Sequence, residues 1–230
     1  MRRKLVLFDI DGTLVTDGGA SRDAFADGLA TVYGYDGDIG RYDFSGKTDP
    51  QITHMVMGDH GLGAAEIDKR LTELWSHYLR GLERNATASR VRVLPGIARL
   101  LERLAADPSI MLGLLTGNIE PGARLKLGPH SLNRYFPFGA FGSDSPRREE
   151  LPPIAVERAM KIDGHRFHGE EVVIIGDSIY DVRCGVPHAA TTIAIASGKT
   201  SAERLRAENP TYFFASAEET EGILEALGVS

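Results

Sequence analysis

The chain has 230 residues and a formal net charge of −6, with 42% hydrophobic and 25% charged residues, which are ordinary values for a water-soluble globular protein. The acidic balance argues against nucleic acid or an anionic membrane surface as the main partner, although a small anionic substrate needs only a local positive pocket. Cys184 is the only cysteine, so no disulfide can form within the chain. The basic residues at 2–4 precede an apolar run too short for a signal peptide or a membrane span. We therefore expect a cytoplasmic protein, a monomer or a homodimer, with neither a nucleic-acid nor a membrane partner.

An apolar run at residues 5–8 leads directly into Asp9 and Asp11. Such a run, bounded by turn residues, predicts a strand buried on both faces of a parallel sheet, and Gly12 allows a sharp turn after it. The two carboxylates would repel each other and resist burial, so a hard divalent cation is expected near them. Taken alone, the motif could equally be a strand-ending turn. An EF-hand loop fits less well, because its twelfth position counted from Asp9 is Ala20 rather than glutamate.

Residues 20–90 show no strand pattern, and their apolar residues recur at helical spacing. This spacing predicts helices over 21–32, 50–57 and 64–83. The glycine pair at 18–19 and the segment 85–92 are predicted joints on either side of these helices. We therefore expect a helical cap domain at 17–90, inserted into a core domain formed by 1–16 and 91–230.

Strand and helix patterns alternate from residue 97 to the end of the chain. Helices are predicted from residue 97 and over 121–127, 152–160, 179–184 and 201–208, with strands over 110–116, 139–142, 171–176, 191–196 and 211–214. Alternation of this kind predicts a Rossmann-like α/β fold, in which helices cover both faces of a parallel sheet.

Polar residues follow several of these predicted strands, and in a parallel sheet such strand ends share one edge. A carboxylate such as Asp9 can attack phosphorus and form an aspartyl-phosphate, and Asp11 can act as general acid and base. Thr116 and an arginine can hold phosphoryl oxygens, while Asp9 and Asp177 can ligate Mg²⁺. Asp181 could hold the water ligands of the metal or orient the arginine. The expected active-site residues at this edge are Asp9, Asp11, Thr116, Gly117, Asn118, Arg148, Asp177 and Asp181.

The motifs Asp9-Ile-Asp-Gly-Thr13, Thr116-Gly-Asn118 and Gly176-Asp-Ser-x-x-Asp181, in that order, resemble the haloacid dehalogenase superfamily, and specifically its phosphatase-like members with a helical cap. The resemblance covers essentially the whole chain. The branch that it indicates contains phosphoglycolate phosphatases and β-phosphoglucomutases. It implies Asp9 as nucleophile, Asp11 as acid and base, and Thr116 as a phosphate contact. It also implies Mg²⁺ held by the Asp9 side chain, the Asp11 backbone carbonyl and Asp177, with Gly12, Gly117 and Asn118 at the substrate.

The sequence departs from the family at the lysine that usually precedes the Gly-Asp strand. No lysine occurs between Lys126 and Lys161, and Arg148 is expected to replace it, with Arg147 the second choice. An arginine keeps the charge and can bind phosphate through two N–H groups. The dehalogenase branch lacks the second acid of the first motif, so the presence of Asp11 favours phosphoryl transfer.

The segment 45–50 contains Gly-Lys-Thr but is not a P-loop, because the glycine of that pattern would fall at Arg41 and no strand precedes it. By resemblance to cap-bearing phosphatases, Gly46, Lys47 and Thr48 are substrate-loop candidates. An ordinary helix N-cap at Thr48 or Asp49 is the simpler interpretation, and both can hold together.

These observations predict a Mg²⁺-dependent phosphatase that acts on a small phosphorylated metabolite. A phosphomutase of the β-phosphoglucomutase type would share the same catalytic residues. A non-catalytic phosphate-binding protein on the same fold is a third hypothesis, although such a protein would not need Asp11.

Overall fold

The central strand of the protein is β1 (Lys4–Phe8), as a computed structural model of the chain shows; the structure describes residues 3–229. Met1 and Arg2 of the basic N-terminal run lie outside the described residues, as does Ser230. Strand β1 pairs in parallel with β4 (Ile110–Thr116) on one side and with β6 (Val172–Gly176) on the other. The sheet continues outward to β5 (Gly139–Phe141), and on the other side to β7 (Thr191–Ile195) and β8 (Tyr212–Phe214), giving the parallel order β5-β4-β1-β6-β7-β8. The change of direction at β1 leaves a crevice beyond its carboxyl end, where open α/β sheets bind their ligands.

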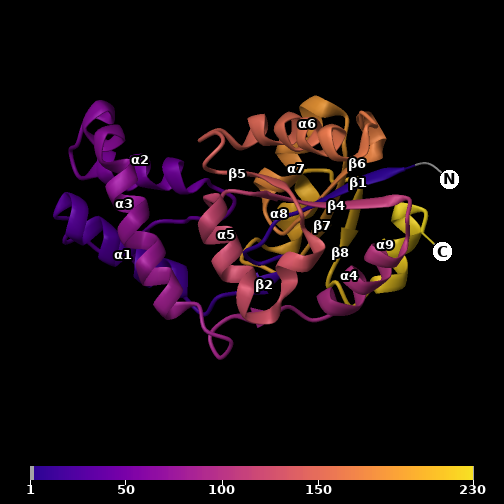
Figure 1. The fold of residues 1–230 in the computed structure, drawn as a ribbon, viewed down its shortest axis with the longest axis horizontal. Helices are drawn as coiled ribbons and strands as arrows, with labels where there is room; N and C mark the ends of the chain where they lie inside the picture. Colours follow the sequence, from indigo (N-terminus) through magenta and orange to yellow (C-terminus); the bar gives the residue numbers. More distant parts are fainter. Residues whose placement is uncertain (1–2, 230) are drawn as a thin grey trace.

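Helices cover both faces of this sheet, as the alternation of elements predicts (Figure 1). Val6 and Phe8 pack on one face with α4 (Ile97–Ala106), α5 (Glu120–Leu127) and α9 (Thr220–Leu227). Leu5 and Leu7 point to the other face and pack with α6 (Leu151–Asp163) and α7 (Ile179–Gly185). The short helix α8 (Ala202–Ala207) follows β7 in the sequence. Burial on both faces explains why β1 is a continuous apolar run rather than an alternating one.

Segment 17–90 carries helices and no strand, and Figure 1 shows it as a separate group beside the sheet. Its elements are α1 (Ala20–Tyr33), the 3-10 turn η1 (Ile39–Arg41), α2 (Asp49–Asp59) and α3 (Ala64–Asn85). Helices α1 and α3 lie side by side, and Phe25 contacts Tyr78 edge-to-face with ring centroids 5.5 Å apart. Such an aromatic contact adds about 1 kcal/mol beyond the area it buries.

The two connections between this helical segment and the sheet pair with each other. Val15–Thr16 (β2) and Arg92–Val93 (β3) form a two-stranded antiparallel ribbon in which Val15 faces Val93. The sequence predicts joints near these positions but not the ribbon, because two-residue strands carry no detectable alternation. Side-by-side passage of the two connections brings their backbone groups within hydrogen-bonding reach.

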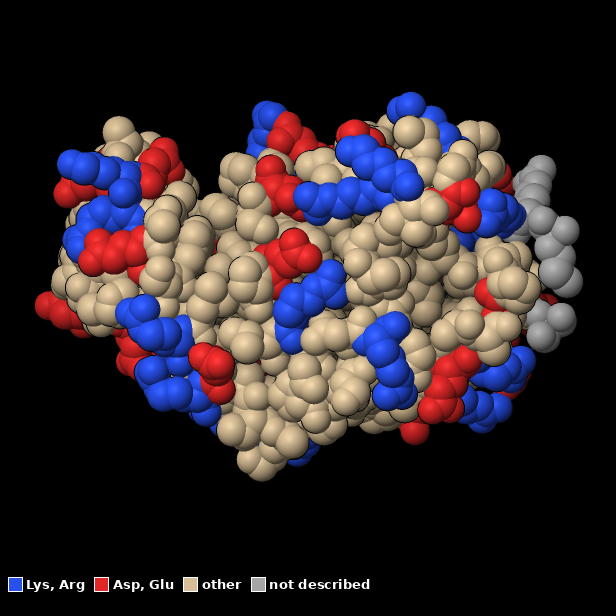
Figure 2. Space-filling model, viewed as in Figure 1, with Lys and Arg blue, Asp and Glu red and all other residues tan. Residues whose placement is uncertain are grey.

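The predicted strands and helices agree with the structure to within a few residues, but α9 and the two-residue strands β2 and β3 were not predicted. Over residues 3–229, none of the helices combines the length and apolar character needed to cross a bilayer. Basic and acidic side chains are interspersed over the face shown in Figure 2.

Candidate active site

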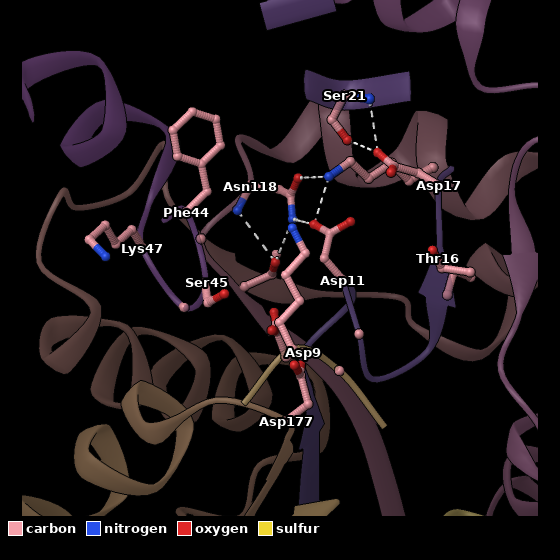
Figure 3. Close-up of a pocket in the computed structure, with 18 of the residues that line it drawn as sticks. Asp9, Asp11, Thr16, Asp17, Ser21, Phe44, Ser45, Lys47, Asn118 and Asp177 are labelled. Atoms are coloured by element: carbon pink, nitrogen blue, oxygen red, sulfur yellow. Dashed lines mark hydrogen bonds and ion pairs between the residues drawn. The ribbon is translucent and has the colours of Figure 1, made fainter. Parts of the chain in front are cut away.

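A cavity of about 450 Å³ lies between the helical segment and the carboxyl ends of β1, β4 and β6. The sheet side contributes most of the acids and the helical segment contributes aromatic and basic side chains, as the close-up in Figure 3 shows in part. The lining residues include Asp9, Asp11, Gly12, Thr116, Asn118, Lys126, Arg148, Asp177, Arg22, Phe25, Phe44, Lys47 and Tyr78. The predicted convergence of the strand-end residues therefore occurs.

Asp9 follows the last residue of β1 and is only 5% exposed. Its backbone N–H donates to the carbonyl of Ile175 at 3.0 Å, which continues the sheet pairing by one residue. Burial raises the pKa of Asp9 to about 6, and the charges of Asp181 and Asp11 also raise it. The Arg148 guanidinium, 3.3 Å away, acts in the opposite direction and lowers it. The carboxylate thus faces a cation on one side and other acids nearby, so additional positive charge would stabilise its ionised form.

Asp177 lies beside Asp9 at the end of β6, and Figure 3 shows the two side chains close together. One oxygen each of Asp9, Asp177 and Asp181 lie within 4.8 Å of one another. Burial and the charges of Asp181 and Asp9 raise the pKa of Asp177 well above its ordinary value. Buried carboxylates that disfavour one another's ionisation, with oxygen donors only, fit a hard divalent cation such as Mg²⁺.

Both carboxylate oxygens of Asp181 accept hydrogen bonds from protein groups. Its Oδ1 accepts from Arg148, and its Oδ2 accepts from the backbone N–H of Ser178 at 2.9 Å and from the Ser178 hydroxyl at 2.6 Å. Asp9 and Asp177 therefore have more capacity for direct metal ligation, whereas Asp181 contacts the Arg148 guanidinium.

Gly12 forms the turn after the two aspartates of the first motif, and its backbone lies close to the Asp177 side chain. Its φ is +83°, and a Cβ at this position would lie only 2.5 Å from the Asp177 Oδ2. A side chain would thus be strained by the backbone and would displace a candidate metal ligand. The hydroxyl of Thr13 donates to Asp177 Oδ1 at 3.0 Å and fixes that carboxylate from the same turn.

Arg148, rather than Arg147, enters the site. Arg148 begins the 3-10 turn η4 (Arg148–Glu150), is 5% exposed and donates to Asp181, to the Leu115 carbonyl at 3.3 Å and to the Gly46 carbonyl at 3.3 Å. Burial alone would lower the pKa of this guanidinium, but the Asp181 and Asp9 carboxylates raise it. Arg147 is 68% exposed and pairs with Glu150 on the surface.

The predicted Thr116-Gly117-Asn118 motif begins at the last residue of β4 and lines the cavity. The Thr116 hydroxyl accepts from the Asn118 side-chain amide at 2.8 Å, so its own hydrogen remains available to donate. The Asn118 amide also donates to Asp11 Oδ2 at 2.8 Å, and Figure 3 shows these two side chains directed toward each other. Gly117 is closely approached by the helical segment, since a Cβ there would lie 2.1 Å from the Lys47 carbonyl oxygen.

The predicted substrate loop is only partly placed at the cavity. Gly46 and Lys47 line it, but the Lys47 ammonium donates to the Asp43 carbonyl at 2.9 Å and lies over the Tyr180 ring. Figure 3 shows this side chain directed away from the acids. Thr48 is the N-cap of α2, accepting from Gln51 N at 3.2 Å and donating to the Pro146 carbonyl at 2.8 Å. Its hydroxyl is thus used in capping, and Thr48 is not among the residues that line the cavity.

Lys126 of α5 is the main residue that sequence reasoning missed. It is 3% exposed, and its Nζ lies 2.6 Å from both Asp11 Oδ2 and Asn118 Oδ1. Burial alone would lower the pKa of this lysine, but the charge of Asp11, with smaller effects of Tyr78, Asp17 and Asp49, raises it. The signal was its position on the buried face of its helix, three residues after Ala123. A lysine on an otherwise apolar face must have a partner in the interior.

Asp49 joins the helical segment to the core at the edge of the cavity. Its backbone N–H donates to the Gly117 carbonyl and its Oδ2 accepts from the Ile119 N–H, both at 2.8 Å. Burial raises the pKa of this carboxyl from 3.8 to about 6, while the charge of Lys126 and the Ile119 hydrogen bond oppose the rise. The native state therefore retains a proton that the unfolded chain releases between about pH 4 and 6, so ionisation of Asp49 costs stability as pH rises through this window.

Asp49→Asn is expected to remove this pH-dependent cost. An amide oxygen can still accept from Ile119, so the free energy of unfolding of the variant relative to the unmodified protein should rise between pH 4 and 6, by up to about 3 kcal/mol. Urea unfolding at several pH values measures this difference, with Asp59→Asn at the exposed end of the same helix as the control. A difference that stays constant with pH would contradict the expectation.

Comparison with known proteins agrees with this geometry. The family model described as haloacid dehalogenase-like hydrolase matches residues 6–185, and a related hydrolase-like model matches residues 151–220. A phosphoglycolate phosphatase from Pseudomonas savastanoi pv. phaseolicola is 26% identical over 220 residues, covering 90% of this chain and 74% of the relative.

Solved structures share the fold along the whole chain. A hydrolase from Pseudomonas syringae superposes with a TM-score of 0.73 at 18% identity, covering 100% of both chains. A predicted phosphatase from Clostridium acetobutylicum gives the same TM-score of 0.73 at 20% identity, covering 98% of this chain and 100% of that one. The first family model spans most of the chain, including most of β1 and all of β4 and β6, together with Asp9, Asp11 and Asp177. The chain belongs to the haloacid dehalogenase-like hydrolase family.

Proposed function

We propose that the protein is a Mg²⁺-dependent phosphomonoester hydrolase that acts on a small phosphorylated metabolite through an aspartyl-phosphate intermediate. The observation that carries this proposal is the meeting of Asp9, Asp177 and Arg148 in one buried cluster, with Asp11 beside it at the cavity. A nucleophilic carboxylate, a cation for phosphoryl oxygens and a separate acid are what this hydrolysis needs. The names of the phosphatase relatives support the same reaction.

In this proposal Asp9 attacks phosphorus while the bond from phosphorus to the ester oxygen breaks. Asp11 gives its proton to the departing oxygen, so the leaving group departs as an alcohol. Asp11 then takes a proton from water, which attacks the phosphorus of the aspartyl-phosphate and releases inorganic phosphate and free Asp9. Arg148 and the hydroxyl of Thr116 would hold phosphoryl oxygens throughout.

Asp9, the Asp11 backbone carbonyl and Asp177 would hold the Mg²⁺, with Asp181 in support. The ion would supply charge that offsets the repulsion between the Asp9 carboxylate and the phosphate dianion. Gly12, Gly117 and Asn118 would border the phosphate, because all three line the cavity together with Asp9 and Arg148.

Residues 17–90 would act as the cap domain over a core of 1–16 and 91–230. Its contribution to the cavity is mixed: Phe25 and Phe44 are apolar, while Arg22 and Lys47 are basic. A cavity of about 450 Å³ also suits a small leaving group. The proposed substrate is therefore a small phosphomonoester, and the phosphoglycolate phosphatase relative makes phosphoglycolate the first compound to assay.

Phosphate release from a panel of small phosphomonoesters, with and without Mg²⁺, tests this function. We expect release from at least one compound at a rate that falls by at least about 10³-fold when the metal is chelated and returns when Mg²⁺ is added. No release from any compound would reject a hydrolase. Conversion of a sugar 1-phosphate to its 6-phosphate without net phosphate release would indicate a mutase instead.

A further inference from the structure

Lys126 forms a contact with Asp11 that the proposed reaction does not itself account for. Two donors reach the Asp11 carboxylate, and both bind Oδ2. They are the Lys126 ammonium at 2.6 Å and the Asn118 side-chain amide at 2.8 Å. Among the described residues no hydrogen bond to Oδ1 is formed. The two oxygens of this carboxyl group are therefore in different surroundings.

The contact is built into the fold rather than formed at the surface. Lys126 is buried in α5, whereas the Asp11 side chain is 44% exposed to the cavity. Asn118 contacts both members of the pair. Its side-chain carbonyl oxygen accepts from Lys126 at 2.6 Å, while its side-chain amide donates to both Asp11 and Thr116. Rotation of the Asp11 carboxyl group would break two hydrogen bonds at once.

We propose that Lys126 is a positioning residue that holds Asp11 by Oδ2 and so presents Oδ1 to the ester oxygen of the substrate. This inference rests on the proposed function, in which Asp11 protonates the leaving group. It assigns the acid and base chemistry to one oxygen of the carboxyl group. It also gives a reason for a buried cation here, since a lysine buried without a partner would be strongly destabilising.

A positioning role predicts that the loss on removing Lys126 depends on the leaving group. An alkyl phosphate needs a proton on its departing oxygen, whereas 2,4-dinitrophenyl phosphate releases a stable anion and does not. The ratio kcat/KM is the right quantity, because it reports the steps up to departure of the leaving group and not the later hydrolysis of the aspartyl-phosphate.

Lys126→Met keeps the unbranched stem and removes the ammonium. We expect kcat/KM to fall by at least about 30-fold for the alkyl phosphate and by less than about threefold for the dinitrophenyl ester. Asp11→Asn should show the same dependence, and the double variant should be within about threefold of Asp11→Asn alone, because Lys126 acts through Asp11. Lys161→Met, which removes an exposed lysine on α6, is the control and should change neither ratio.

Equal losses on both substrates, or losses that multiply in the double variant, would overturn the inference and leave the proposed function standing. A higher KM with unchanged kcat, by the same factor on both esters, would assign Lys126 to substrate binding and would also overturn it. If Lys126→Met does not fold, Lys126→Gln retains an amide NH₂ group as donor without a buried charge and is judged by the same ratio. An unmodified protein that hydrolyses neither ester with Mg²⁺ would reject the proposed function itself, and the inference with it.

Discussion

Asp9→Asn is expected to lower phosphate release by about 10⁴-fold or more, because an amide oxygen cannot replace the carboxylate as nucleophile. The substitution preserves the size of the side chain and removes only its charge. Burial already raises the pKa of Asp9 to about 6, so the ionised group is costly to keep in the interior at neutral pH. The variant should therefore fold, with a midpoint of thermal unfolding at pH 7 that is no lower than that of the unmodified protein.

Two measurements separate a lost nucleophile from a damaged fold. Steady-state phosphate release gives the loss of turnover, and acid quenching with labelled substrate shows whether phosphate becomes bound to the protein. Asp27→Asn, which changes an exposed carboxylate of α1, is the control and should retain full activity. Residual hydrolysis above about one tenth of the original rate would remove Asp9 from the nucleophile's role.

The fold could be predicted because its strands are recognisable one at a time. A strand buried on both faces needs an unbroken apolar run, and 5–8 and 172–175 have one. Once the strands alternate with helices, a parallel sheet brings their carboxyl ends together. Asp9 and Asp177, 168 residues apart in the chain, thus meet without any contact that sequence spacing would reveal.

What could not be predicted depends on side-chain direction and on pairings without a pattern. The helical spacing places Lys126 on the buried face of α5, but only the packed helix shows that its ammonium reaches Asp11, beyond the end of β1. Lys47 shows the opposite case: its loop reaches the cavity, but the ammonium binds within the loop itself. The β2–β3 ribbon arises only because two distant connections run side by side.

The choice between Arg147 and Arg148 illustrates the same limit and leads to the second large expected effect. Neighbouring arginines are equivalent in sequence, but only one side chain enters the interior. Arg148→Ala would leave Asp9 and Asp181 buried without their cation, and breaking a buried ion pair in this way costs about 3–5 kcal/mol. We expect a loss of stability of this size at pH 7, together with a fall in kcat/KM of at least about 10²-fold.

Arg147→Ala is the matched control, because Arg147 is 68% exposed and pairs only at the surface. Its effect on the free energy of unfolding should stay within about 0.5 kcal/mol. Urea unfolding and phosphate-release kinetics on both alanine variants measure the difference. A third variant, Arg148→Lys, should recover part of the stability, because it restores the charge but not the planar guanidinium. The pH dependence gives a further test. Arg148 lowers the pKa of Asp9, so without the arginine Asp9 takes up its proton at a higher pH than in the unmodified protein. The destabilisation by Arg148→Ala should therefore shrink as pH falls toward about 6. Equal effects of the two alanine variants would mean that Arg148 is not the cation on which these carboxylates depend.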